Sequence, residues 1–254
     1  MADRKIIIAN WKMRLDITAS MQLIQDVFTR MQKSSFEHLE IVVCPSYDSL
    51  AAVSEYIGDS EIGLGAQDVF WQERGAYTGE ISASMLRALG VSLVIIGHSE
   101  RRKHNHETDE IVNNKIKAAG AQDLVPVLCV GETYEERSKG HTDLIIMRQV
   151  IEGLKGIPLE EGQKLIIAYE PVWVIGTGQA IEPPMVEHAS EVINQALIEL
   201  YSLDTISKQI RIIYGGSVDE SNIAAYLTLP KIEGALVGTA SVNPDKFVPL
   251  LKKL

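Results

Sequence analysis

Eight short apolar runs alternate with longer amphipathic stretches along the 254 residues, and this regular alternation constrains the fold more than any other feature. Most runs are continuously rich in Ile, Val or Leu, which is typical of strands buried on both faces. They predict strands at 5–9, 40–44, 62–66, 92–97, 125–130, 164–169, 209–214 and 234–237. The clearest helical stretch, 183–200, places Val186, Ala189, Ile193 and Leu197 on one stripe. Further helices are predicted at 18–32, 108–119, 135–154 and 245–252.

Repeated strand–helix units are compatible with two arrangements, an eight-stranded parallel barrel and a doubly wound open sheet. A dinucleotide-binding open sheet would carry GxGxxG after an early strand. The first run is instead followed by Asn10, Trp11, Lys12 and Met13. No linker, low-complexity segment or charge block divides the chain. We therefore predict an α/β fold, a single-domain eight-stranded parallel (β/α)8 barrel that spans residues 1–254.

Composition excludes several classes of partner. The chain has 34 acidic and 24 basic residues, a formal net charge of -10, whereas nucleic-acid binding needs a basic surface. A small anionic substrate remains compatible because it responds to the local field of a cleft. No run approaches the ~20 apolar residues of a membrane span, and the N-terminal segment lacks the apolar core of a signal peptide. Cys44 and Cys129 lack metal or redox spacing and are interpreted as buried thiols. We expect a soluble cytoplasmic protein that binds neither membranes nor nucleic acid.

Polar or glycine-rich clusters follow at least six of the eight runs. In chain order these are Asn10-Trp11-Lys12, Gly97-His98-Ser99-Glu100-Arg101, Gly131-Glu132, Glu170-Pro171, Gly215-Gly216-Ser217 and Gly238-Thr239. In a parallel barrel the ends of successive strands all point to one face. The sequence therefore predicts one cleft that gathers a lysine, a histidine, a glutamate and several glycines.

The last two clusters predict a phosphate site. Barrels often bind phosphate through backbone N–H groups of the loops that follow the last two strands. Gly215, Gly216 and Gly238 would let the backbone approach an anion closely, and Ser217 adds a hydroxyl donor. The alternative interpretation is that these glycines only form tight turns.

Glu170 is the candidate base. It ends the apolar run 165–169 and precedes segment 171–182, in which apolar residues lie between Pro171 and Gly176-Thr177-Gly178. Apolar residues flanked by a proline and a Gly-x-Gly hinge are interpreted as a moving lid, and the basicity of Glu170 should rise when the lid expels water. Such a carboxylate is suited to removing a proton α to a carbonyl. A structural, ion-paired carboxylate is the alternative.

His98 and Lys12 complete the candidate chemistry. His98 alone among six histidines directly follows a buried strand, and Ser99 is predicted to cap a helix that starts at Glu100. A helix N-terminus disfavours imidazolium, so His98 would be a neutral hydrogen-bond donor. Lys12 could reach a phosphate and a developing enediolate oxygen, to which Asn10 could also donate. A core histidine and a surface lysine are the alternatives. Together these groups predict proton transfer between adjacent carbons of a phosphorylated hydroxycarbonyl compound.

Seven motifs in order give the whole chain a close resemblance to the triosephosphate isomerase family. They are Ala9-Asn10-Trp11-Lys12-Met13, Gly65-Ala66-Gln67-Asp68-Val69, Gly75-Ala76-Tyr77-Thr78-Gly79-Glu80-Ile81-Ser82, Ile96-Gly97-His98-Ser99-Glu100-Arg101-Arg102, Cys129-Val130-Gly131-Glu132-Thr133, Ala168-Tyr169-Glu170-Pro171-Val172-Trp173 with Ile175-Gly176-Thr177-Gly178, and Tyr214-Gly215-Gly216-Ser217-Val218.

The resemblance implies a role for each matching residue. Glu170 would be the base, His98 the neutral electrophile and Lys12 the stabiliser of the charged intermediate, supported by Asn10 and Glu100. The phosphate would be held by Gly176, Ser217, Gly238 and the Thr239 amide. The resemblance further implies dihydroxyacetone phosphate and glyceraldehyde 3-phosphate as substrates, in glycolysis and gluconeogenesis, without cofactor or metal. It implies a homodimer in which the loop from Gln67 to Ile81 inserts into the partner, with Thr78 reaching the neighbouring active site near Asn10.

Three departures from the family pattern leave alternatives open. The family usually has alanine at Val174, often lysine at Gln179, and a second glycine at Thr239. A β-branched residue tolerates positive φ poorly, so we expect Thr239 to adopt an ordinary φ and still donate its N–H to phosphate. The alternatives are an isomerase of a longer ketose phosphate such as erythrulose phosphate, a catalytically silent barrel, and a Schiff-base aldolase. The aldolase would need a lysine at the end of a late strand, where strands six and seven offer none.

Overall fold

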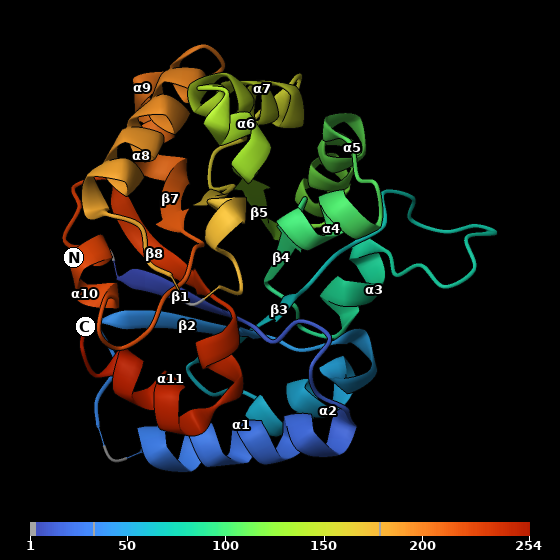
Figure 1. The fold of residues 1–254 in the computed structure, drawn as a ribbon. Coiled ribbons are helices and arrows are strands. Elements are labelled where there is room, and N and C mark those ends of the chain that lie inside the picture. The colour runs from blue at the N-terminus through green and yellow to red at the C-terminus, as the bar shows by residue number, and fades with distance from the viewer. Residues whose placement is uncertain (1–3, 33, 178) are drawn as a thin grey trace.

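The computed structural model describes residues 4–32, 34–177 and 179–254, and its centre is a closed barrel of eight parallel strands in chain order (Figure 1). The strands are β1 (Lys5–Asn10), β2 (Leu39–Cys44), β3 (Ile62–Ala66), β4 (Leu93–Ile96), β5 (Val125–Val130), β6 (Leu165–Tyr169), β7 (Ile210–Tyr214) and β8 (Ile232–Val237). The predicted eight-stranded parallel barrel is confirmed, and no strand boundary differs from its prediction by more than two residues.

Helices surround the barrel (Figure 1). They are α1 (Ile17–Met31), α2 (Tyr47–Ile57), α3 (Ala83–Ala88), α4 (Ser99–His104), α5 (Asp109–Gly120), α6 (Tyr134–Ser138), α7 (Thr142–Leu154), α8 (Pro183–Ile198), α9 (Leu203–Gln209), α10 (Ile223–Leu227) and α11 (Pro244–Leu251), with 3-10 turns η1 (Val172–Val174) and η2 (Thr239–Val242). The prediction of one helix over 135–154 is wrong. Gly140 adopts a φ of +72°, which no α-helical residue takes, and α6 and α7 lie on either side of it. In the part of the chain described, no helix combines the length and apolar character that a bilayer crossing requires.

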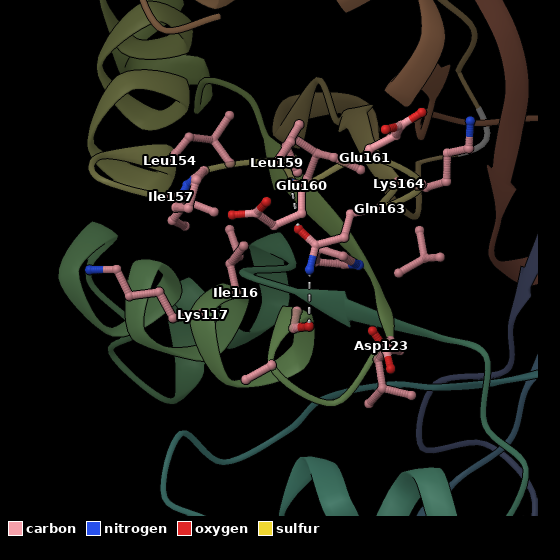
Figure 2. Close-up of a pocket in the computed structure, with 18 residues that line it drawn as sticks. Ile116, Lys117, Asp123, Leu154, Ile157, Leu159, Glu160, Glu161, Gln163 and Lys164 are labelled. Carbon is pink, nitrogen blue, oxygen red and sulfur yellow. Dashed lines mark hydrogen bonds between the residues drawn. The ribbon is translucent and has the colours of Figure 1, made fainter. Parts of the chain in front are cut away.

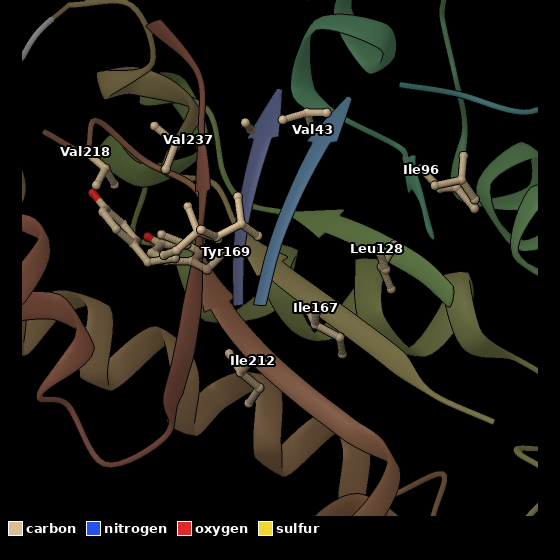
Figure 3. Close-up of a cluster of buried hydrophobic side chains, with 14 of the residues drawn as sticks. Val43, Ile96, Leu128, Ile167, Tyr169, Ile212, Val218 and Val237 are labelled. Atoms are coloured by element: carbon tan, nitrogen blue, oxygen red, sulfur yellow. The ribbon is translucent and has the colours of Figure 1, made fainter. Parts of the chain in front are cut away.

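Side chains of the strands alternate between two hydrophobic layers. The inner layer fills the barrel and includes Ile6, Ile8, Ile166 and Ala168. The outer layer lies between the strands and the helices, and Figure 3 shows several of its strand residues, such as Ile167. Since the alternation has a period of two, Asn10 and Glu170 continue the inward-facing rows of β1 and β6 beyond the last apolar residue. Alternation along buried strands thus directs these two polar side chains into the mouth of the barrel.

The two cysteines belong to the inner layer. Cys44 and Cys129 are fully buried free thiols, as predicted, and burial raises the pKa of both. Neither thiol is therefore a ready nucleophile at neutral pH.

The barrel closes where β1 pairs with β8. Ile6 lies opposite Gly234 in this pairing. A Cβ added to Gly234 would lie only 2.0 Å from the carbonyl oxygen of Ile6, which is far inside van der Waals contact. The close approach of the first and last strands therefore requires glycine at position 234.

The loop between β3 and α3 projects away from the barrel (Figure 1, teal). Residues 72–80 are all exposed, although Tyr77 stacks on Phe70 with ring centroids 4.8 Å apart. The predicted long connection 67–81 is thus an extended arm, internally stiffened by an aromatic pair.

Candidate active site

A cavity of about 350 Å³ opens at the carboxyl ends of the strands. Its lining comprises Asn10, Lys12, His98, Glu170, Ile175, Gly176, Thr177, Gly215, Gly216, Ser217, Val218, Asp219, Leu236, Gly238, Thr239, Ala240 and Lys246. The cavity thus gathers eight of the ten residues singled out in the sequence. The other two lie outside it: Glu100 contacts two of the lining residues, and Thr78 is exposed on the projecting loop.

Glu170 is buried at the floor of this cavity, with 2% of its surface exposed. Its backbone N–H donates to the Val130 carbonyl at 2.7 Å, which continues the β5–β6 pairing. Its Oε2 accepts the Ser99 N–H at 3.0 Å, and its Oε1 lies 3.0 Å from His98 Nε2. Among the described residues Oε1 forms no hydrogen bond. A buried carboxylate oxygen without a donor is available to bind a proton.

The charge state of Glu170 follows from these neighbours. Burial raises the pKa of Glu170, but His98, the Ser99 amide and Lys12 together outweigh burial and hold the pKa below its ordinary value. The carboxylate is therefore ionised at neutral pH, as a general base must be.

His98 is held in one tautomer by the helix that follows it. Its Nδ1 accepts the Glu100 N–H at 3.2 Å, so Nδ1 carries no proton and the ring proton lies on Nε2. The predicted cap at Ser99 is wrong: α4 begins at Ser99, and His98 itself is the capping residue. Gly97, with a φ of +69°, turns the chain between β4 and this cap. This geometry leaves the Nε2–H of His98 to donate, and the neutral state expected from the sequence stays a prediction.

Lys12 and Asn10 line the cavity at the end of β1, beside the eighth loop. Lys12 Nζ lies 2.7 Å from Glu100 Oε1, and Asn10 Oδ1 accepts the Lys12 N–H at 3.0 Å. Lys12 adopts a φ of 56°, which is uncommon for a residue with a side chain. Gln67 supports this conformation by donating from Nε2 to the carbonyls of Lys12 and Cys44, both at 2.9 Å. Sequence reasoning missed this role of Gln67, although its position directly after β3 was a signal.

Backbone groups of the seventh and eighth loops also line the cavity. Gly215 N–H donates to the Tyr169 carbonyl at 2.8 Å, which brings the seventh loop beside Glu170. Thr239 starts η2 and does not have a positive φ, as expected for a β-branched residue. A Cβ added to Gly238 would lie 3.8 Å from Lys12 Nζ, so the lysine amine lies against the eighth loop. These groups make the cavity suitable for an anion.

The start of the segment 171–182 is tied to the barrel through Glu132. This carboxylate is fully buried and accepts Trp173 Nε1–H at 2.9 Å and the Tyr169 hydroxyl at 3.2 Å. Arg137 lies over the Trp173 ring, 4.5 Å from its centroid. Val174 is fully buried and is not among the residues that line the cavity. The predicted hinge residue Gly178 lies outside the described residues, whereas Gly176 lines the cavity with a φ of +78°.

A second cavity of about 350 Å³ lies at the opposite end of β5 and β6 (Figure 2). Its walls are mainly apolar, with Ile116, Leu154, Ile157 and Leu159 among them. Gln163 also lines this cavity. Its side chain accepts the Glu160 N–H and donates to the Gly120 carbonyl. Because active sites of parallel barrels lie at the carboxyl ends of the strands, this cavity is not the candidate active site.

Parallel barrels with a base and an anion pocket at this mouth form a broad class of enzymes that act on small phosphorylated compounds. The fold and the cavity place the chain in that class.

Comparison with known sequences and structures identifies the family. A sequence model of the triosephosphate isomerase family matches residues 5–254, and the chain belongs to this family. It is therefore an isomerase.

Individual relatives agree over nearly the whole chain. Triosephosphate isomerases from Dictyoglomus thermophilum and Dictyoglomus turgidum are 46% and 44% identical, each covering 98% of this chain and 99% of the relative. The crystal structure of triosephosphate isomerase from Bartonella henselae superposes with a TM-score of 0.86 at 33% identity, covering 98% of both chains.

Proposed function

We propose that the chain interconverts dihydroxyacetone phosphate and D-glyceraldehyde 3-phosphate by proton transfer through an enediolate, in glycolysis and gluconeogenesis. The observation that carries this proposal is the buried, ionised Glu170 beside the Nε2–H of His98, in a cavity that also presents backbone groups to an anion. Family membership supplies the class of substrate.

Glu170 is the base that moves the proton between the two substrate carbons. In the described conformation its Oε2 is engaged by the Ser99 N–H. Turning toward a substrate would release that hydrogen bond, which is one of the interactions that lower its pKa. The basicity of Glu170 therefore rises as it leaves Ser99, at the step where a stronger base is needed.

His98 and Lys12 stabilise the negative charge that develops on the substrate oxygens. The proton on Nε2 of His98 is available to these oxygens, because Nδ1 is occupied by the Glu100 N–H. The Lys12 ammonium supplies positive charge, and Glu100 holds it at 2.7 Å. Asn10 accepts the Lys12 N–H through Oδ1, which leaves its amide N–H₂ free to donate to the same oxygens.

The phosphate is held by the loops that follow β6, β7 and β8. Gly176, Ser217, Gly238 and Thr239 all line it, and short backbone segments without bulky side chains allow close approach of N–H groups to an anion. We expect the Thr239 amide to donate to phosphate despite the threonine side chain, because its φ is ordinary.

The chain acts as one barrel domain over residues 1–254 and assembles as a homodimer in the cytoplasm, without membrane or nucleic-acid partners. The projecting loop from Gln67 to Ile81 would insert into the partner, with Thr78 near the partner's Asn10. Support for the dimer comes from the exposed arm, residues 72–80.

Isomerisation of glyceraldehyde 3-phosphate, coupled to reduction of the product, tests the proposal. Glu170→Gln keeps the shape of the side chain and removes the base, so turnover should fall by about 10³-fold or more. Glu55→Gln, on the exposed surface of α2, is the matched control and should retain full activity. Slow turnover by every variant, including the unaltered chain, would refute the triose assignment and direct the assay to four- and five-carbon ketose phosphates.

A further inference from the structure

Lys246 is a cavity residue that neither the sequence motifs nor the proposed mechanism use. It lies in the first turn of α11, and it lines the same cavity as Ser217, Gly238 and Thr239. Within the described residues its ammonium makes no ion pair or hydrogen bond. Lys246 is exposed to solvent, so its ammonium can turn toward an anion in the cavity.

The neighbours of Lys246 explain why its side chain is left to the cavity. Asp245 is engaged by Arg30 Nη1 at 2.6 Å, on the α1 side of the helix. Phe247 is fully buried and fixes the other side of α11 in the core. Successive residues of a helix point about 100° apart, so these two anchors leave Lys246 facing neither α1 nor the core. Its flexible four-carbon stem can follow an anion in the cavity.

The charges of the cavity show what Lys246 would add. Lys12 is the other lysine of the lining, and its charge is offset by Glu100 at 2.7 Å. Glu170 and Asp219 both contribute carboxylates to the lining. A phosphate dianion therefore enters a cavity in which the remaining charges are largely negative. Lys246 supplies uncompensated positive charge on the phosphate side.

We propose that Lys246 is a phosphate-binding residue of this enzyme, which attracts the dianion and holds it together with the backbone groups of the seventh and eighth loops. This inference rests on the proposed function for the identity of the ligand. It differs from the roles of Ser217, Gly238 and Thr239, because a side-chain cation acts through long-range attraction that salt screens.

The test titrates inorganic phosphate against the unaltered enzyme, Lys246→Met and Lys246→Arg by calorimetry. Lys252→Met, at the exposed C-terminal end of α11, is the matched control, because it removes the same charge from the same helix outside the cavity. We expect Lys246→Met to raise the Kd about three- to tenfold at low ionic strength and less than about twofold at ~0.5 M salt. Lys246→Arg should restore most of the affinity, and Lys252→Met should leave it unchanged.

Steady-state kinetics with triose phosphate supply the second readout. The loss in kcat/KM for Lys246→Met should lie mainly in KM, since a group that binds the unreacting phosphate acts on substrate and transition state alike. Equal phosphate affinity in Lys246→Met and the unaltered enzyme would overturn the inference, as would an equal loss in Lys252→Met. An unaltered enzyme that fails to isomerise triose phosphate would refute the proposed function instead, and the phosphate titration would still decide the role of Lys246.

Discussion

Gly131 provides a sharp test of how the backbone positions Glu170, the proposed base. It follows β5 and lies against the start of the lid, where a Cβ added at this position would fall 1.8 Å from the Glu170 carbonyl oxygen. The residue cannot simply move away, because its N–H donates to Gln149 Oε1 at 2.7 Å. In Gly131→Ala the collision must therefore be relieved by displacing Glu170.

The size of that displacement follows from the contact. Real Cβ atoms essentially never approach another heavy atom within 3.0 Å, so the Glu170 backbone must retreat by about 1.2 Å from the new methyl carbon. Overpacking a buried site costs about 1–3 kcal/mol of unfolding free energy. Misplacing a catalytic group by about 1 Å costs about 10²-fold in rate. We expect Gly131→Ala to show both losses.

The assay combines turnover with urea unfolding, and it uses Gly120→Ala as control. Gly120 ends α5, has no heavy atom within 4 Å of an added Cβ and does not have a positive φ. This control should match the unaltered chain or gain up to about 1 kcal/mol. If Gly131→Ala kept kcat within about threefold and lost less than about 0.5 kcal/mol, the argument that the glycine fixes the base would be refuted.

Two further predictions concern buried carboxylates. Trp173→Phe removes the N–H that Glu132 accepts at 2.9 Å. It should lower the unfolding free energy measured in urea by about 1–3 kcal/mol and raise KM, because the lid is held less firmly. An unchanged KM would argue against the hydrogen bond from Trp173 to Glu132 as what holds the lid. Burial raises the pKa of Asp68 to about 6 from its ordinary 3.8, with Lys115 opposing the rise and Glu107 adding to it. The folded state therefore retains a proton that the unfolded state has lost, and as pH rises from about 4 to 6 the unfolding free energy should fall by up to about 1.4 kcal/mol per unit from this group. Urea unfolding across that range should show a smaller fall in Asp68→Asn, and equal slopes would contradict the assignment.

The barrel could be predicted from the sequence because its strands are buried on both faces. Continuous apolar runs such as 125–130 leave little doubt about strand identity, and their order leaves few topologies. Helices were harder to predict. The α2 helix, which was not among the predicted helices, carries Leu50, Val53 and Ile57 on one face. The break at Gly140 depends on a backbone angle that composition does not specify.

The direction of a site side chain could be predicted where the residue continues the alternation of a strand, but not where the residue lies in a turn. Glu170 and Asn10 follow the inward parity of β6 and β1, so their direction was implied by the alternation. His98 follows Gly97, whose positive φ resets the direction of the chain. Serine is the usual helix cap, and only the structure places the imidazole Nδ1 in that role. Lys246 comes from a helix after the last strand, where no strand-end rule applies.

The pairing of β1 with β8 means that the barrel can close only after the last strand has been synthesised. Residues 6–9 find their partners only at 234–237, more than two hundred residues later in synthesis. A nascent chain that stops short of this segment leaves β1 and β7 each with an open edge, and open edges recruit other chains. The seam is thus where an unfinished or truncated product is most prone to aggregate, and loss of the final strand should be far more damaging than its share of the length suggests.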